Sequence, residues 1–279
     1  IEHISELKSQ GAKIIKGDNI KAMEQAAKPE LMRKNLGLKM IRRANSIGHH
    51  YFIANLTSKD IASSVALAVN EKHGIWYNPM TGEYHEATIG DKGIQLNLKS
   101  GESRILITSN KPVNEWKLGP KVKVGGKEAI AAADSKTIDL TENAWKLSFI
   151  EDAPKVDETF NLKGVKSWEG LSDKAKVMMG TGVYETTIKL SKDDAKKQWA
   201  IDLGDVRESA RVYINNKYVG CAWAVPYILN CKDALNKGKN TLRIKVTNLP
   251  ANRIAELDRQ GVKWRKMKEI NVVDINYKK

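Results

Sequence analysis

The stretch DLGDVRESARVYINNKYVG (Asp202–Gly220) predicts two strands joined by a tight turn. Apolar and polar residues alternate on both sides of Asn215-Asn216, which is the period of a half-buried strand. Asparagine tolerates the positive φ angles that a two-residue hairpin turn requires. The stretch therefore predicts an antiparallel hairpin, and similar short segments around it predict a β-sandwich.

Segments with a period of two, separated by turn residues, occupy most of the chain. In the second half we expect strands at Trp145–Phe149, Val183–Leu190, Trp199–Leu203, Ala210–Ile214, Tyr218–Ala222 and Thr241–Thr247. In the first half we expect them at Leu38–Ala44, Tyr51–Leu56, Ser64–Val69, Gly74–Tyr77, Ile94–Leu98 and Arg104–Thr108. The fold class is therefore mostly β, with two antiparallel sandwiches.

The first residues have a different pattern. It predicts a helix over His3–Gln10 closed by Gly11, a strand at Ala12–Ile15 and a helix from Asp18 to Ala27. So short an α/β piece cannot bury a core of its own. We therefore expect it to be the remnant of a preceding α/β domain, and the chain to be part of a longer protein.

The expected domains follow from these patterns. Residues 1–36 would end the preceding α/β domain, and residues 37–110 would form a small β-sandwich. Residues 111–136, rich in Gly, Pro and Ala, would be a linker with one strand at Val122–Val124. Residues 137–279 would form the second, larger sandwich, with its last strand missing.

The second sandwich resembles the sugar-binding jelly roll of glycoside hydrolase family 2, a galactose-binding-like fold. Four segments carry the resemblance: GVYETT (Gly182–Thr187), Asp202–Gly220, Pro226-Tyr227 and LNKGKNTL (Leu235–Leu242). The family has Asp-Ile-Thr where this chain has Asn230-Cys231-Lys232, so a carboxylate that could bind Ca²⁺ is missing from this segment. We expect no cofactor, and a structural Ca²⁺ ion elsewhere stays open.

The chain also resembles the C-terminal region of the α-L-rhamnosidases of glycoside hydrolase family 106. This resemblance rests on VTNLPANR (Val246–Arg253), YFIANLT (Tyr51–Thr57), WYNPMTG (Trp76–Gly82) and LKSGES (Leu98–Ser103). It implies a catalytic domain upstream of Ile1, a substrate that is a rhamnose-containing, plant-type polysaccharide, and a secreted or periplasmic protein.

Glycoside hydrolysis needs two carboxylates that flank the scissile bond. The acidic residues of this chain are scattered over expected turns and strand ends, and none forms a pair that the sequence places in a cleft. We therefore expect no catalytic residue here, and the role of a structural and carbohydrate-contacting part of a hydrolase. The alternative is a stand-alone carbohydrate-binding or protein-interaction module with no link to a hydrolase.

Sugar binding would use aromatic platforms with polar partners beside them. The candidates in expected loops are Trp168, Trp223, Tyr227 and Trp264, with Asn252 and Arg253 as polar partners. Each has an alternative role. The aromatic rings could pack the loops or an upstream domain, and Asn252 and Arg253 could hold the last turns by hydrogen bonds.

The formal net charge of +14 raises the question of a nucleic-acid partner. The lysines are dispersed and no nucleic-acid motif accompanies them, so we expect no nucleic-acid partner. No apolar run approaches the roughly 20 residues that span a bilayer, so we expect no membrane span. Cys221 and Cys231 could form a disulfide or remain free thiols.

Overall fold

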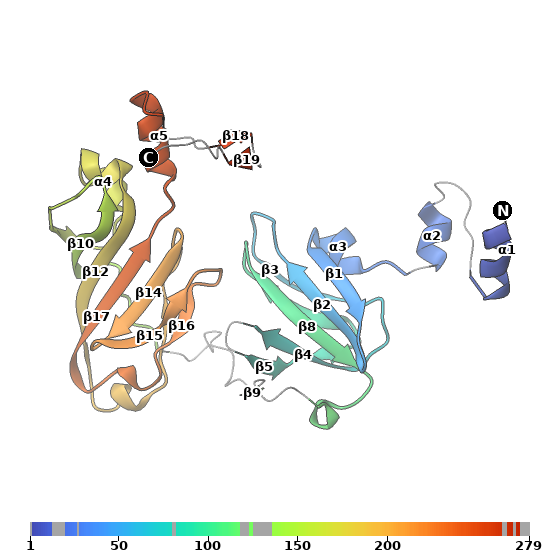
Figure 1. The fold of residues 1–279 in the computed structure, drawn as a ribbon. Helices are drawn as coiled ribbons and strands as arrows, with labels where there is room; N and C mark the ends of the chain where they lie inside the picture. Colours follow the sequence, from blue (N-terminus) through green and yellow to red (C-terminus); the bar gives the residue numbers. More distant parts are fainter. Residues whose placement is uncertain are drawn as a thin grey trace. The chain divides into compact units, whose positions relative to one another are not determined.

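The computed structural model describes residues 2–12, 20–26, 28–79, 82–117, 123–124, 136–263, 267–269 and 272–273. The chain divides into two compact units, Ile1–Ile130 and Ala131–Lys279. Both are built mainly of antiparallel strands, which confirms the mostly β fold class (Figure 1). Over the described residues, no helix has the length and apolar character to cross a membrane.

The first unit begins with three short helices, α1 (Glu2–Ser9), α2 (Ile20–Ala26) and α3 (Leu31–Leu36). The first ends as expected at Gly11, which has a φ of 85° and whose amide donates to the carbonyl of Lys8. The sequence patterns did not predict α3, whose Met32 is fully buried in the core of the first sandwich. The expected strand Ala12–Ile15 lies outside the described residues, apart from Ala12.

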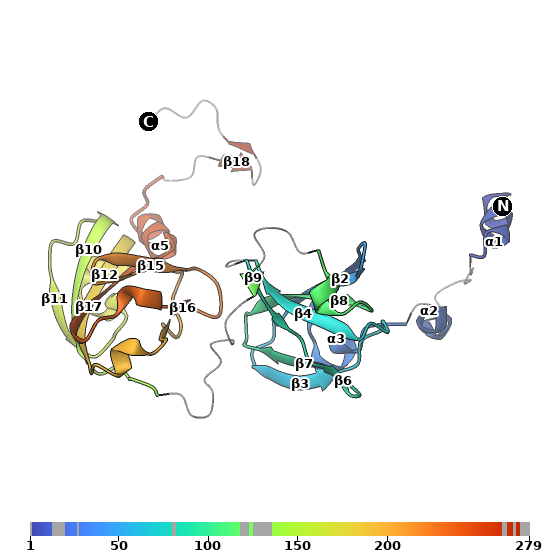
Figure 2. The ribbon, with the colours of Figure 1, turned by 90° about the horizontal axis from the view of Figure 1, so that it is seen from below.

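Two facing sheets form the first sandwich (Figure 2). The larger has the order β1-β2-β8-β4-β5-β9, with bounds Lys39–Ala44, Gly48–Ala54, Ser103–Ser109, His73–Asn78, Glu83–Glu86 and Lys123–Val124. The smaller has the order β3-β7-β6, with bounds Ile61–Val65, Gly93–Leu98 and Ile89–Gly90. Every pairing is antiparallel except that of β5 with β9.

The core of this sandwich reflects the alternation in its sequence. Ile94, Leu96 and Leu98 of β7 are buried while the residues between them are exposed. They share one apolar cluster with Tyr51 and Ile53 of β2. Burial of each such side chain contributes about 1.5–3 kcal/mol, so the period of two fixes which face of each strand points inward.

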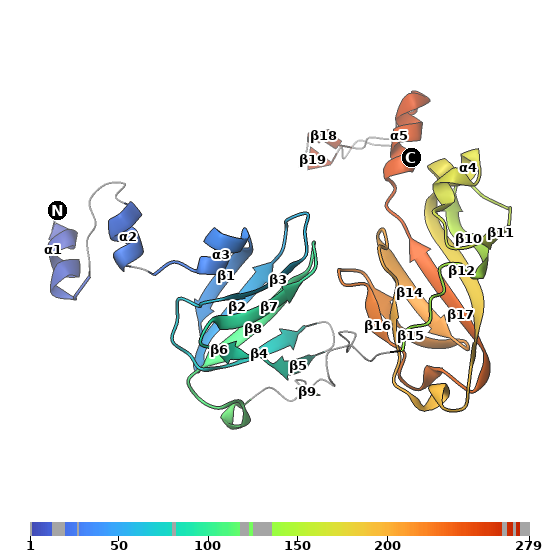
Figure 3. The same cartoon turned by 180° about the vertical axis from the view of Figure 1, so that it is seen from behind.

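The second unit has one large sheet with the order β11-β10-β12-β17-β14-β15 (Figure 3). The bounds are Phe160–Lys163, Ala144–Ala153, Met179–Leu190, Gly238–Thr247, Ser209–Ile214 and Lys217–Ala222. A two-stranded sheet, β13 (Ala200–Asp202) with β16 (Ile228–Asn230), adds to the fold. Trp199, Ile201 and Leu229 from this second layer pack against the core of the large sheet.

The hairpin predicted from Asp202–Gly220 is present. Asn215 and Asn216 have φ angles of 51° and 64°, which a two-residue turn of this kind requires. The strands that they join, β14 and β15, pair antiparallel, with Ile214 opposite Lys217.

Helical segments complete the unit. They are α4 (Asp173–Val177), α5 (Ala251–Arg259) and the 3-10 turns η2 (Trp168–Gly170), η3 (Asp194–Lys196) and η4 (Lys232–Ala234), while η1 (Val113–Glu115) belongs to the first unit. A small hairpin, β18 (Met267–Glu269) with β19 (Val272–Val273), follows α5. Cys221 and Cys231 are free thiols, and burial raises the pKa of Cys231 to about 11.

Candidate functional site

Several loops of the second unit meet at one end of its large sheet. Ser209, where β14 begins, lies opposite Thr247, where β17 ends, and Thr247 also lies opposite Thr181 near the start of β12. Ala222, the last residue of β15, pairs with Ala210. The segments just outside these positions, 203–208, 223–227 and 248–253, therefore emerge at the same end, which we call the loop end.

Trp223 is the exposed aromatic residue of the loop end. It directly follows β15, and 57% of its surface is accessible. An exposed indole can stack on the apolar face of a pyranose ring, and it binds with little loss of conformational entropy. Of the predicted aromatic residues that the structure describes, Trp223 is the one whose ring is exposed.

Trp168 lies in the core instead. It is 7% exposed, and its ring stacks on Tyr184 with centroids 6.3 Å apart and planes at 26°. Phe149 meets it edge-on, with centroids 5.7 Å apart. The Tyr184 hydroxyl donates to the carbonyl of Lys166, and burial raises the pKa of Tyr184 to about 12. This aromatic cluster leaves no open ring face on Trp168 for a sugar.

Tyr227 is also largely buried, at 8% exposure, and it belongs to the core cluster. Its carbonyl accepts a hydrogen bond from the amide of Leu203, which ties together the two loops that flank β13 and β16. Burial first, and then the negative charges of Glu208 and Asp205, raise the pKa of its phenol. Tyr227 therefore supports the loop that carries Trp223.

Sequence reasoning did not identify the ion pair beside this loop. Arg207 donates to both carboxylate oxygens of Asp205, with Nε and Nη2 each 2.7 Å away. This fork geometry holds the guanidinium in one plane and lowers the pKa of the Asp205 carboxyl. The spacing of Asp205 and Arg207, two residues apart, is the sequence signal that could have indicated the pair. The exposed pair places two charged side chains at the loop end.

Two asparagines of the C-terminal segment hold secondary structure together. Nδ2 of Asn252, in the first turn of α5, donates to Oε1 of Glu169 in η2 at 2.7 Å. Asn248 bonds through its side chain to Gly180 and Met178 at the start of β12. Arg253 is half-buried on α5. Trp264 lies outside the described residues.

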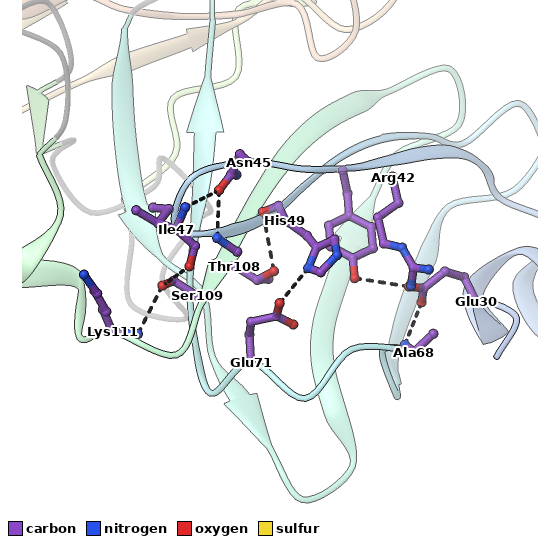
Figure 4. Close-up of polar contacts among 12 residues, drawn as sticks. Glu30, Arg42, Asn45, Ile47, His49, Ala68, Glu71, Thr108, Ser109 and Lys111 are labelled. Atoms are coloured by element: carbon purple, nitrogen blue, oxygen red, sulfur yellow. Dashed lines mark hydrogen bonds and ion pairs between the residues drawn. The ribbon is translucent and has the colours of Figure 1, made fainter. Parts of the chain in front are cut away.

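The first unit contains a separate buried polar network (Figure 4). Oε1 of Glu30 accepts hydrogen bonds from Arg42 at 2.6 Å and from the Tyr51 hydroxyl at 3.1 Å. Its Oε2 accepts from the amide of Ala68 at 3.0 Å. These bonds tie the segment before α3 to β1, β2 and the segment after β3, so the carboxylate has a structural role.

A second buried acid of this unit lies beside a histidine. Nδ1 of His49 is 2.6 Å from Oε1 of Glu71, and Oε2 of Glu71 is buried without a hydrogen-bond partner (Figure 4). Across the described ranges, no group of three or more His, Cys, Asp or Glu side chains is arranged to hold a metal ion.

Comparison with known proteins gives the class of the second unit. Residues 172–277 match the family model for the glycosyl hydrolase 2 galactose-binding domain-like fold. A protein of Formosa agariphila (strain DSM 15362), named "Putative beta-glucuronidase", is 29% identical over 172 residues, which are 58% of this chain and 15% of the relative. Residues 172–277 are therefore similar to a galactose-binding-like domain related to glycoside hydrolases.

The likeness extends beyond this unit. The structure of a rhamnosidase from Novosphingobium sp. PP1Y matches with a TM-score of 0.62 and 21% identity, over 89% of this chain and 24% of that one. The chain therefore shares the fold of the matched part of that rhamnosidase. The chain spans about a quarter of that structure, and less of the Formosa relative.

Proposed function

We propose that this chain is a non-catalytic part of a glycoside hydrolase, one that braces a catalytic domain and contacts the polysaccharide substrate. The observation that carries the proposal is an exposed indole, Trp223, at the loop end of a galactose-binding-like sandwich. The proposed substrate is an α-L-rhamnoside in plant-type polysaccharide, which the fold of the Novosphingobium rhamnosidase supports. A secreted or periplasmic location suits such a substrate.

The state of the acidic residues supports a non-catalytic role. A catalytic acid or nucleophile must be free to face the glycosidic bond. The buried carboxylate of Glu30 is bound by Arg42, Tyr51 and Ala68. That of Glu102 accepts from Arg104 and from the amide of Lys99.

Glycoside hydrolases use two catalytic carboxylates that lie about 5–9.5 Å apart, and both must be available to the substrate. Asp194, a buried acid of the second unit, is bound by Lys136, Lys197 and Ser191, which lower the pKa of its carboxyl. These contacts give Glu30, Glu102 and Asp194 structural roles, and the proposal assigns catalysis to a domain outside this chain.

An assay of the 279-residue chain against 4-nitrophenyl α-L-rhamnopyranoside tests the non-catalytic assignment. We expect no release of nitrophenol above the uncatalysed rate. Turnover that persists through purification and is lost on substitution of one carboxylate of the chain would overturn the assignment. The corresponding β-glucuronide, included because one relative bears that name, should give the same negative result.

A further inference from the structure

The outward face of the large sheet in the second unit is strongly basic. Because side chains alternate along a strand, the residues that do not contribute to the core share this face. One row crosses all six strands through facing residues: Asn161, Lys146, Glu185, Arg243, Tyr213 and Tyr218. A neighbouring row contains Ser148, Val183, Lys245, Arg211 and Cys221.

Cations of this face lie opposite one another. Arg211 of β14 faces Lys245 of β17, and Lys189 of β12 faces Lys239 of the same β17. Like charges at directly opposed positions destabilise a sheet. Among the described, paired residues of this face, Glu185 is the acidic one. Its carboxylate accepts a hydrogen bond from Nε of Arg243 at 2.8 Å. The face therefore has a large excess of positive charge, which an anionic partner would offset.

Two aromatic rings lie among these cations. Tyr213 and Tyr218 have ring centroids 5.4 Å apart, and Tyr218 is 54% exposed. Nζ of Lys245 lies 5.4 Å from the ring centre of Tyr213. We call Arg211, Tyr213, Tyr218, Arg243 and Lys245 the basic face.

We infer that the basic face binds an acidic polysaccharide whose sugar rings carry carboxylates. The guanidinium of Arg211 can hold a carboxylate through two parallel hydrogen bonds. The neighbouring ring of Tyr218 can pack against the apolar side of a pyranose. Because a sheet face is broad and open, it suits an extended chain rather than a single enclosed sugar. The inference goes beyond the loop end and does not depend on Trp223.

The test uses the 279-residue chain and polygalacturonate as the probe, with titration calorimetry at low ionic strength. We expect binding that weakens as salt is added, because exposed charges are screened. Fully methyl-esterified polygalacturonate has the same backbone without the charge and should bind at least tenfold more weakly. Equal binding of the two polymers would overturn the inference.

Variants locate the site. The double variant Arg211→Ala with Lys245→Ala should weaken polygalacturonate binding about tenfold or more. The double variant Lys192→Ala with Lys196→Ala removes the same charge from exposed residues after β12 and should leave binding within twofold. Thermal unfolding of both variants checks that they fold. Equal losses in both would show that net charge alone acts, and would contradict a defined site.

Two further measurements separate this inference from the loop-end proposal and from binding of nucleic acid. Trp223→Ala should leave polygalacturonate binding unchanged, so failure of the loop end and failure of the basic face are distinguishable. Single-stranded DNA also offers negative charge and stacking surfaces. If it binds as tightly as polygalacturonate and is equally sensitive to Arg211→Ala with Lys245→Ala, the face recognises nucleic acid or charge in general, and the polysaccharide assignment fails.

Discussion

The ring of Trp168 fills the space that Gly182 leaves open by having no side chain. A Cβ atom at position 182 would lie 2.5 Å from Cζ3 of Trp168, which is closer than real carbon contacts allow. Gly182 belongs to β12, at the centre of the large sheet, and Trp168 begins the 3-10 turn η2, which precedes this strand in the chain. The contact explains why a tryptophan outside the strands is a core residue.

Gly182→Ala should therefore destabilise the second unit. The added methyl group cannot fit without moving the indole, and overpacking of this kind costs about 1–3 kcal/mol. Gly170→Ala is the matched control, because nothing lies within 4 Å of a Cβ at that position. Urea denaturation followed by tryptophan fluorescence measures both. Equal stability of the two variants would contradict the packing described for Trp168.

The two tryptophans Trp168 and Trp223 should respond in opposite ways to truncation. Trp168→Ala removes a buried ring and should cost about 3–5 kcal/mol of stability. Trp223→Ala removes an exposed ring and should change the free energy of unfolding by less than about 0.5 kcal/mol. Thermal and urea unfolding of the two variants would check this. A large loss of stability in Trp223→Ala would mean that its ring is a packing element.

Asn240 should be a main determinant of the turn that precedes β17. It is fully buried, and its Oδ1 accepts from the amide of Asn236 at 2.7 Å and from Nδ2 of Asn215 at 2.8 Å. Its Nδ2 donates to the carbonyls of Asn236 and Gly238. Asn240→Ala leaves these groups without partners and should cost about 3 kcal/mol. The exposed side chain of Asn236 makes Asn236→Ala the control, with an expected change near zero in the same denaturation assay.

Alkaline pH should weaken the fold through Tyr184. Its folded pKa is about 12 against an ordinary value of 10.0, because burial disfavours the phenolate. The unfolded chain therefore releases this proton first, so the stabilising contribution is complete below pH 10 and is lost as the pH rises toward 12. Tyr184→Phe should flatten part of the fall in unfolding free energy between pH 10 and 12. An identical pH profile in the variant would show that other groups cause the fall.

Most of the fold could be predicted from the sequence because burial imposes a period of two. The strands around Tyr51, Ile94 and Val212 agree with the predictions within three residues, since buried apolar side chains alternate along each. The hairpin at Asn215-Asn216 was found because few residues tolerate its φ angles.

Shorter elements were missed where no periodic signal exists. Strands β11 and β16 have four and three residues, too few to establish alternation. Helix α5 follows a Pro at position 250 with no side-chain cap, and it buries no residue. From the sequence, the start of α5 therefore could not be distinguished from a turn stabilised by Asn252.

The candidate site could be predicted only in part. An aromatic residue in a loop suggests either a platform or packing, and the sequence does not tell which. Burial separates them: Trp168 and Tyr227 lie inside, while Trp223 lies outside. The basic face could not be found from the sequence, because its residues come from separate strands and meet only through the register of the sheet.

The central proposal is that Trp223 contacts polysaccharide. Titration calorimetry of the wild-type chain with rhamnogalacturonan oligosaccharides tests it most directly, with Trp223→Ala and the exposed control Phe52→Ala from the first unit. At a salt concentration that screens the charges of the basic face, the account predicts millimolar or tighter binding that Phe52→Ala retains and Trp223→Ala loses. Binding that is undetectable in the wild type, or unchanged in Trp223→Ala, would contradict it.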